Sequence, residues 1–228
     1  MIGLGGLVRR NRGIVEACAL AAAALVFVWL VGITNPPPPR GVNTDRLGPD
    51  NGEQVGEYIA RAEASLHESG AEMNPKWALV SFDSGVGVRD SLDPVGEARV
   101  AQVLLRVSID RVQTPVVSVG VPGTPESIVE SPDIAATRLH GTTGQWDRQS
   151  RIDAASATSL ASGCDCVVGF VVRAPGDVLQ AIAAHPLVRA VEALPADAIG
   201  GRFAVRAFLP DYVDVVGPLP DDGDVPAG

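Results

Sequence analysis

The residues best suited to chemistry are two cysteines, Cys164 and Cys166, which are separated by one aspartate. They open an apolar stretch, residues 164–174, that predicts a buried strand. Alternate residues of a strand face the same side, so the two thiols would have Cα atoms about 6.6–7 Å apart, at the upper edge of disulfide geometry. A disulfide between them therefore needs a local bend. Three alternatives stay open: a local disulfide or buried structural thiols, an intermolecular disulfide, and a redox or metal-handling pair.

No other group of residues supports catalysis or metal binding. The histidines His67, His140 and His185 are far apart in the sequence, and two thiols alone do not make a zinc site. A His-Gly-Thr-Thr-Gly run begins at His140, but the chain lacks the Gly-x-Ser-x-Gly motif of a nucleophile elbow. The Gly-rich run at 83–87 lacks the Lys-Ser/Thr of a phosphate loop. We therefore expect a protein that is not an enzyme, with no catalytic residue, no cofactor and no metal.

The longest apolar segment, residues 14–33, is interrupted by one charge, Glu16. As a helix it would be about 30 Å long, enough to cross the hydrocarbon core of a bilayer. A cleaved signal peptide is the alternative, but its apolar core is usually about 7–15 residues long and is followed by a small-x-small site that is missing here. The segment therefore predicts an uncleaved, single-pass transmembrane helix in contact with the lipid bilayer.

The charges beside this segment predict its orientation. Arg9, Arg10 and Arg12 precede it, and no acidic residue does. Because positive flanks stay in the cytoplasm, residues 1–13 are expected there and everything beyond the span outside it. The predicted localisation is the cell membrane, with an extracytoplasmic C-terminal domain.

Composition divides the part beyond the span into three. Residues 34–49 contain four successive prolines, which favour an extended polyproline II linker. Residues 50–209 carry the apolar periodicity of a folded α/β domain. Residues 210–228 are acidic and rich in proline and glycine, which predicts a disordered tail.

The charge of the chain limits its partners. Beyond the predicted anchor there are 26 acidic and 15 basic residues, a net charge of −11. Such an acidic surface argues against nucleic acid and bare anionic lipid. An unknown envelope or membrane protein is the expected partner. Lys76 is the only lysine among 18 basic residues, a bias typical of GC-rich genomes such as those of actinobacteria.

The periodic segments predict an order of elements that occurs twice, helix–strand–helix–strand. Such halves can interleave into a ferredoxin-like βαββαβ sheet with its helices on one face, each half having one additional leading helix and the end one additional strand. A small open α/β sandwich with another strand order is the alternative. The expected helices are 50–70, 94–107, 147–163 and 175–184, the strands are 77–82, 112–121, 164–174, 188–194 and 202–209, and 122–144 is a loop.

Four short runs carry a resemblance to a known group of proteins. They are Gly-Cys-Asp-Cys-Val at 163–167, Val-Val-Arg-Ala-Pro at 171–175, His-Pro-Leu-Val-Arg-Ala-Val at 185–191 and Tyr-Ile-Ala-Arg-Ala at 58–62. With them the chain resembles uncharacterised actinobacterial single-pass membrane proteins with a Gly-Cys-x-Cys-Val strand motif. The resemblance covers most of the outer domain. It implies the same layout and adds no reaction.

These observations predict a membrane-anchored extracytoplasmic protein of non-enzymatic function, a protein-interaction or envelope-associated domain. One alternative is a sensor or accessory domain that binds a small ligand in the 122–144 loop. The other is a thiol redox module that uses Cys164 and Cys166.

Overall fold

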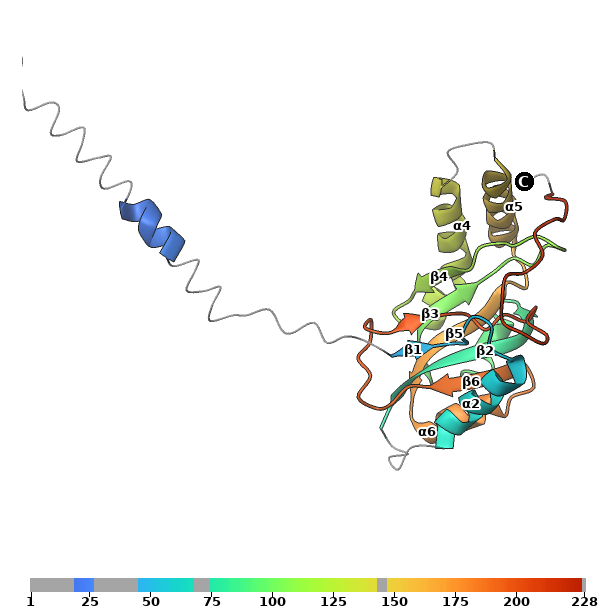
Figure 1. Cartoon of the computed structure of the whole chain (residues 1–228), viewed down its shortest axis with the longest axis horizontal. Helices are drawn as coiled ribbons and strands as arrows, with labels where there is room; N and C mark the ends of the chain where they lie inside the picture. The colour runs from blue at the N-terminus through green and yellow to red at the C-terminus, as the bar shows by residue number, and fades with distance from the viewer. Residues whose placement is uncertain (1–18, 27–44, 68–73, 143–146, 227–228) are drawn as a thin grey trace, which may run out of the picture. The chain divides into compact units, whose positions relative to one another are not determined.

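The structure is a computed structural model that describes residues 19–26, 45–67, 74–142 and 147–226 (Figure 1). The chain divides into two compact units, Met1–Asn43 and Thr44–Gly228. In the first unit only residues 19–26 are described, and they are helical. The predicted transmembrane segment 14–33 therefore lies mostly outside the described residues. Within the described ranges, no helix has both the length and the apolar character needed to cross a membrane.

The second unit is a mixed α+β structure built on one five-stranded antiparallel sheet. Its strand order is β4-β3-β5-β2-β6, and every neighbouring pair is antiparallel. A separate parallel pair joins β1 and β7. The strands are β1 (Arg46–Leu47), β2 (Lys76–Val86), β3 (Arg99–Leu105), β4 (Val117–Gly120), β5 (Val167–Ala174), β6 (Val188–Ala193) and β7 (Ala204–Val205).

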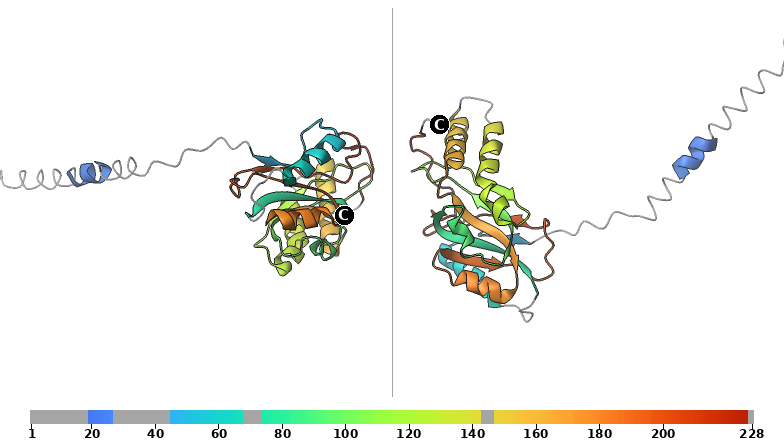
Figure 2. Two further views of the ribbon diagram at one scale, coloured as in Figure 1. Left: turned by 90° about the horizontal axis from the view of Figure 1, so that it is seen from below. Right: turned by 180° about the vertical axis from the view of Figure 1, so that it is seen from behind.

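The sheet is covered on both faces, because its strands are apolar on both sides. Val80 and Phe82 of β2 pack with the buried residues of α3 (Pro125–Val129), α4 (Ser131–Thr142), α5 (Arg148–Ser162) and α6 (Gly176–Ala183). Leu79, between them, packs on the other face with α2 (Val55–His67) and with the chain's C-terminal part. Figure 2 shows α2 and α6 on opposite sides of the sheet. The expectation that the helices share one face is therefore wrong.

The predicted helix at 94–107 is wrong. Residues 93–97 form a turn, and β3 follows and pairs with β5. The register shifts between Val100 and Gln102, so that Val100 and Val103 point to the same face of the sheet. A β-bulge of this kind produces the three-residue apolar spacing that is typical of a helix.

The predicted loop at 122–144 is also wrong, because α3 and α4 occupy most of it. Thr124 caps α3 by accepting the Ser127 amide at 3.3 Å, and Pro125 is the first helical residue. Pro132 is the second residue of α4. Proline fits the first turn of a helix, where its missing N–H has no partner to lose. Two of the prolines that indicated a loop therefore lie in the first turns of helices. Binding of a small ligand by this segment stays a prediction.

The end of the chain is a packed layer. Residues 203–219, here called the C-terminal strap, cross the face of the sheet that α2 also covers (Figure 1). Phe208, Tyr212 and Val216 are buried there, and the Gly52 amide donates to the Val216 carbonyl at 2.7 Å. The predicted strand 202–209 shrinks to β7, and the predicted disorder is wrong for the described part of the tail, residues 210–226.

Arginines explain why the acidic tail is ordered. Arg106 pairs with Asp211 at 2.5 Å, Arg148 with Asp221 at 3.0 Å and Arg111 with Asp222 at 2.5 Å. Each arginine lies more than seventy residues from its acid. The composition of the tail therefore does not reveal these partners, since they lie far away in the sequence.

A buried carboxylate ties the first described segment of this unit to the sheet. Glu192 of β6 accepts the Gly48 amide at 2.5 Å and the Tyr58 hydroxyl at 3.2 Å. It also pairs with Arg61 of α2, which binds Glu53 at 3.1 Å as well. Burial raises the pKa of Glu192, against the opposing effects of the Gly48 amide and the Arg61 charge.

Candidate functional site

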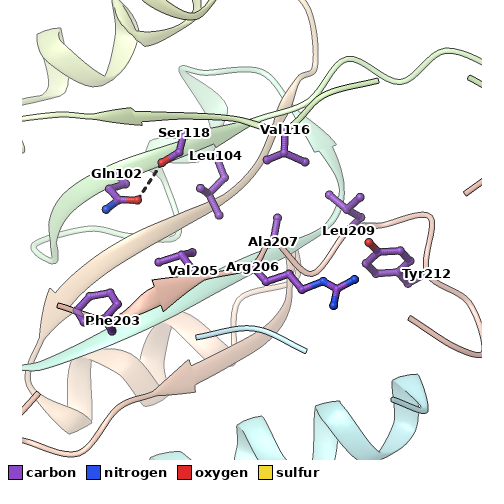
Figure 3. Close-up of a pocket in the computed structure, with 10 residues that line it drawn as sticks. All are labelled: Gln102, Leu104, Val116, Ser118, Phe203, Val205, Arg206, Ala207, Leu209 and Tyr212. Atoms are coloured by element: carbon purple, nitrogen blue, oxygen red, sulfur yellow. Dashed lines mark hydrogen bonds between the residues drawn. The ribbon is translucent and has the colours of Figure 1, made fainter. Parts of the chain in front are cut away.

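A groove of about 530 Å³ lies between the C-terminal strap and strands β3 and β4. Figure 3 shows Gln102, Leu104 and Ser118 facing the strap across this space. Phe203 and Tyr212 stand at its two ends. The volume falls in the range typical of binding sites, about 300–1,000 Å³.

Two separate pairings keep the groove open. Leu104 lies opposite Ser118 in the β3–β4 register, and the Ser118 hydroxyl donates to the Gln102 side chain at 2.9 Å. The facing wall belongs to the strap, whose Val205 pairs with Leu47 of β1 instead of with β4. Val116, just before β4, is 40% exposed although it is apolar. Val116 thus presents apolar surface to solvent beside a polar pair, whereas Leu104, Leu209 and Tyr212 are buried.

Strand β4 also offers main-chain groups, because it is an edge of the sheet. The Val121 amide donates inward to the Ala101 carbonyl at 2.9 Å. Antiparallel strands alternate, so the polar groups of Ser118 and Gly120 point away from β3. The Ser118 carbonyl accepts the Arg138 guanidinium at 2.6 Å, in agreement with this direction.

The opposite edge of the sheet is covered. Helix α2 lies against β6, and the Ala193 amide of β6 donates to the Ser65 hydroxyl of α2 at 2.8 Å. A partner strand would thus meet a helix along β6, whereas at β4 it would meet the outward polar groups of Gly120, the Arg138 side chain that α4 places on Ser118, and the groove. This difference makes the β4 side the candidate site.

Two arginines lie on the strands next to the groove, although neither side chain lines it, and Arg99 packs against Gly123. Arg99 of β3 and Arg173 of β5 are direct cross-strand partners, and Trp77 of β2 lies opposite Arg173. The Arg173 guanidinium is 5.6 Å from the centroid of the Trp77 ring, and the Trp77 and Phe203 ring centroids are 5.6 Å apart. Arg206 lines the groove and donates to Asn51 at 3.3 Å.

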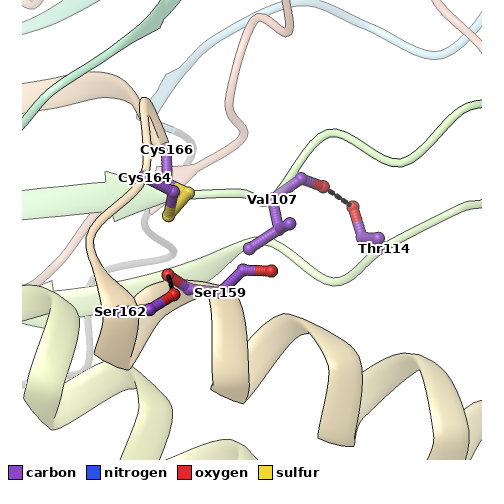
Figure 4. The surroundings of a disulfide bond; sticks show 6 residues. All are labelled: Val107, Thr114, Ser159, Ser162, Cys164 and Cys166. Atoms are coloured by element: carbon purple, nitrogen blue, oxygen red, sulfur yellow. Dashed lines mark hydrogen bonds between the residues drawn. A yellow bond between two sulfur atoms is a disulfide. The ribbon is translucent and has the colours of Figure 1, made fainter. Parts of the chain in front are cut away.

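The predicted cysteine pair is a disulfide in this structure (Figure 4). Cys164 and Cys166 have Cα atoms 5.2 Å apart and lie in a bend before β5 begins, so they are not in the extended strand that the sequence suggested. Cys166 is buried in the core, and its carbonyl accepts the Arg106 amide at 2.8 Å. The bond staples the connection between α5 and β5. A redox role for it stays a prediction.

The other candidate residues remain apart. His67 ends α2, His140 lies near the end of α4, and His185 contacts the Asp93 carboxylate at 3.2 Å. In the ranges that the structure covers, no group of three or more His, Cys, Asp or Glu residues could hold a metal ion.

The Gly-rich run 83–87 has a structural reason. A Cβ atom on Gly85 would lie 2.1 Å from the Asp165 carbonyl oxygen, so only glycine allows this close approach of two backbones.

The sequence did not predict the groove, because its walls are about one hundred residues apart in the chain. The sequence does contain one signal: Pro115 lies two residues before β4, and proline within a sheet is confined to edge strands and bulges, which agrees with β4 as an edge strand.

Comparisons of the chain with protein-family models, with curated proteins and with solved structures find no match. The resemblance to actinobacterial single-pass proteins stays a prediction.

Proposed function

We propose that this protein is a membrane-anchored, extracytoplasmic interaction domain that binds an extended segment of an envelope or membrane protein. The observation that carries the proposal is the open groove beside β4, with an apolar side chain as exposed as Val116 at its margin. The apolar run 14–33 and its arginine flank support the anchor and its orientation.

An extended segment suits this groove better than a helix, because both of its walls are extended. The β3–β4 pair forms one wall and β7 with its neighbours forms the other. A chain beside β4 can bond to the outward polar groups of Gly120 and to the Ser118 amide, since the Ser118 carbonyl already accepts Arg138, and can place an apolar side chain against Val116. Strand addition of this kind gains affinity from the main chain and specificity from the pockets.

We also propose that the sheet is an elaborated ferredoxin-like fold. In that fold the two strands of each unit enclose one strand of the other. Strands β2 and β3 enclose β5, and β5 and β6 enclose β2. Two departures are that η1 (Asp90–Leu92), a short 3-10 helix, takes the place of the first crossover helix, and that β4 and α3 to α5 are inserted. An experimental structure with another strand order would refute this assignment.

Site-specific photo-cross-linking in intact cells tests the interaction. A photoreactive amino acid replaces Val116 in the full chain, and a matched control carries it at Ile134 on α4, which has the same 40% exposure. We expect one specific adduct at Val116 and none at Ile134. The adduct should disappear when Ala207→Trp fills the groove in a protein that still unfolds cooperatively. Equal labelling at both positions, or an adduct that survives the filled groove, would refute the proposal.

A further inference from the structure

An arginine of α4 lies at the open edge of the sheet. The Arg138 guanidinium donates through Nη1 to the Ser118 carbonyl at 2.6 Å, and that carbonyl points outward from β4. The guanidinium is therefore held beside the path of any strand that adds to this edge. Charged side chains at such positions protect exposed strands against unwanted pairing, so Arg138 limits which segments can add to β4.

The rest of this guanidinium is available to a partner from outside. Within the described ranges, Nη1 is the one guanidinium nitrogen of Arg138 with a hydrogen bond, and no ion pair includes this residue. No acidic residue lies three or four positions before or after it in α4, where a helix would bring one within reach. Since the side chain is exposed, its Nε–Nη2 edge can bind a carboxylate through two parallel hydrogen bonds.

Helix α4 and the groove lie on opposite faces of the sheet. The buried residues of α4 pack with Val119 of β4, whereas the next residue back, Ser118, lines the groove. Residues that lie directly opposite one another in paired strands share a face, and neighbours along a strand alternate between the faces. In a strand added to β4, the residue opposite Ser118 would therefore face the groove side, and the residues before and after it would face α4 and Arg138.

We infer that the partner segment places an Asp or Glu carboxylate on Arg138, next in sequence to an apolar residue that contacts Val116 on the groove side. This inference rests on the proposed function and specifies its partner. An acidic residue gains a charge-assisted pair at Arg138, whereas a neutral residue leaves the guanidinium to water and a basic residue is repelled. A segment that alternates acidic and apolar residues therefore fits this edge best.

A binding measurement with defined peptides tests this selection. The full chain in detergent micelles is titrated with fluorescent octapeptides of alternating Val and Glu or of alternating Val and Gln, and fluorescence anisotropy reports binding. We expect the Glu peptide to bind about fivefold more tightly than the Gln peptide, with a difference that shrinks as salt is added. Arg138→Gln should make the two affinities equal. The control Arg151→Gln removes the same charge from an exposed position on α5 and should keep the difference.

A charge reversal gives an independent readout of the same contact. Arg138→Glu should bind a peptide of alternating Val and Lys more tightly than the unchanged chain does, because the new carboxylate would pair with lysine at the same position. The control Arg151→Glu adds the same charge on α5 and should gain less. An equal gain in both variants would refute the inference.

Comparing two peptides on one protein separates selection from folding, because a variant that unfolds loses both affinities together. A preference for Glu that persists in Arg138→Gln would refute the inference. So would equal affinity of the unchanged chain for the Glu and Gln peptides, or binding of neither. The proposed function would stand in each of these cases if the specific Val116 adduct forms, and the absence of that adduct would refute both.

Discussion

Replacing Arg61 with methionine leaves a buried carboxylate without its cation. The Glu192 side chain is only 5% exposed, whereas that of Arg61 is 44% exposed. Methionine keeps most of the apolar stem, so the charge is the main loss. The remaining partners of Glu192 are the Gly48 amide and the Tyr58 hydroxyl.

The expected cost follows from this asymmetry. Removing one partner of a buried ion pair typically costs about 3–5 kcal/mol, and the two hydrogen bonds that remain reduce our expectation to about 2–3 kcal/mol. Glu192→Gln leaves Arg61 partly solvated and still paired with Glu53 at 3.1 Å, so it should cost only about 1 kcal/mol. The double variant should cost less than the sum of the two by about 1–2 kcal/mol.

The penalty should also depend on pH. Burial already raises the pKa of Glu192, and loss of Arg61 raises it further. A carboxyl group whose pKa is raised by folding binds more protons in the folded state than in the unfolded state. The free energy of unfolding therefore falls as pH rises from the pKa of the unfolded state through the raised pKa of the folded state. The Arg61→Met penalty is therefore larger at pH 8 than at pH 5.

Urea unfolding followed by circular dichroism measures both effects on the four proteins of the cycle. A penalty for Arg61→Met that is the same at pH 5 and pH 8 would show that Glu192 does not carry the buried charge. A larger cost for Glu192→Gln than for Arg61→Met would contradict the asymmetry in exposure.

Other contacts lead to predictions that urea titration or hydrogen exchange can check. Gly85→Ala, whose Cβ would meet a carbonyl oxygen at 2.1 Å, should destabilise the protein by at least about 1–3 kcal/mol. Gly56→Ala, in open space on α2, should stabilise it by about 0.5–1 kcal/mol. Similar effects of the two substitutions would contradict the backbone contact at Gly85. Hydrogen bonding to Arg148 lowers the pKa of Asp221 below its ordinary value of 3.8, so its stabilising effect is complete above that value and is lost as pH falls through the lowered one. Amide exchange at residues 219–224 should increase only in that acid range, and exchange that is already fast at neutral pH would contradict the ion pair. Replacing both cysteines of the disulfide by alanine should cost less than about 2 kcal/mol, because the bond closes a very short loop; global unfolding would contradict this.

The pattern of apolar residues in the sequence predicted an element correctly where that strand or helix buries one continuous set of side chains. Helix α5 has its cap at Asp147 and its end at Gly163, as its sequence predicts, and the apolar run after it forms β5. The same pattern gave the wrong prediction for β3, because a bulge places Val100 and Val103 on one face of the strand with the spacing typical of a helix. Pairing with β5 decides that segment, and the partner lies about seventy residues away.

The site depends on distant partners even more than the fold does. Neither Val116 nor Tyr212 is unusual in its local sequence, and they line one groove only because the strap returns across the sheet. The charge and proline content of residues 210–228 predicted disorder, because composition alone does not reveal the distant arginines that bind this segment. The strap is ordered because residues far away in the sequence pack against it and bind it in the folded domain.

The strap's attachment also explains how an open groove survives beside a well-packed core. Arg189 donates to the carbonyls of Leu209, Pro210 and Tyr212 at 2.7–3.2 Å, and its guanidinium lies 4.3 Å from the Phe208 ring centroid. These contacts anchor the strap toward β6, away from β4. The strap already packs on Leu104, which is 3% exposed, and moving it farther toward Val116 would leave a partly buried guanidinium without its carbonyl partners. Because that cost opposes movement of the strap, these contacts keep it in the position from which Leu209 and Tyr212 border the groove.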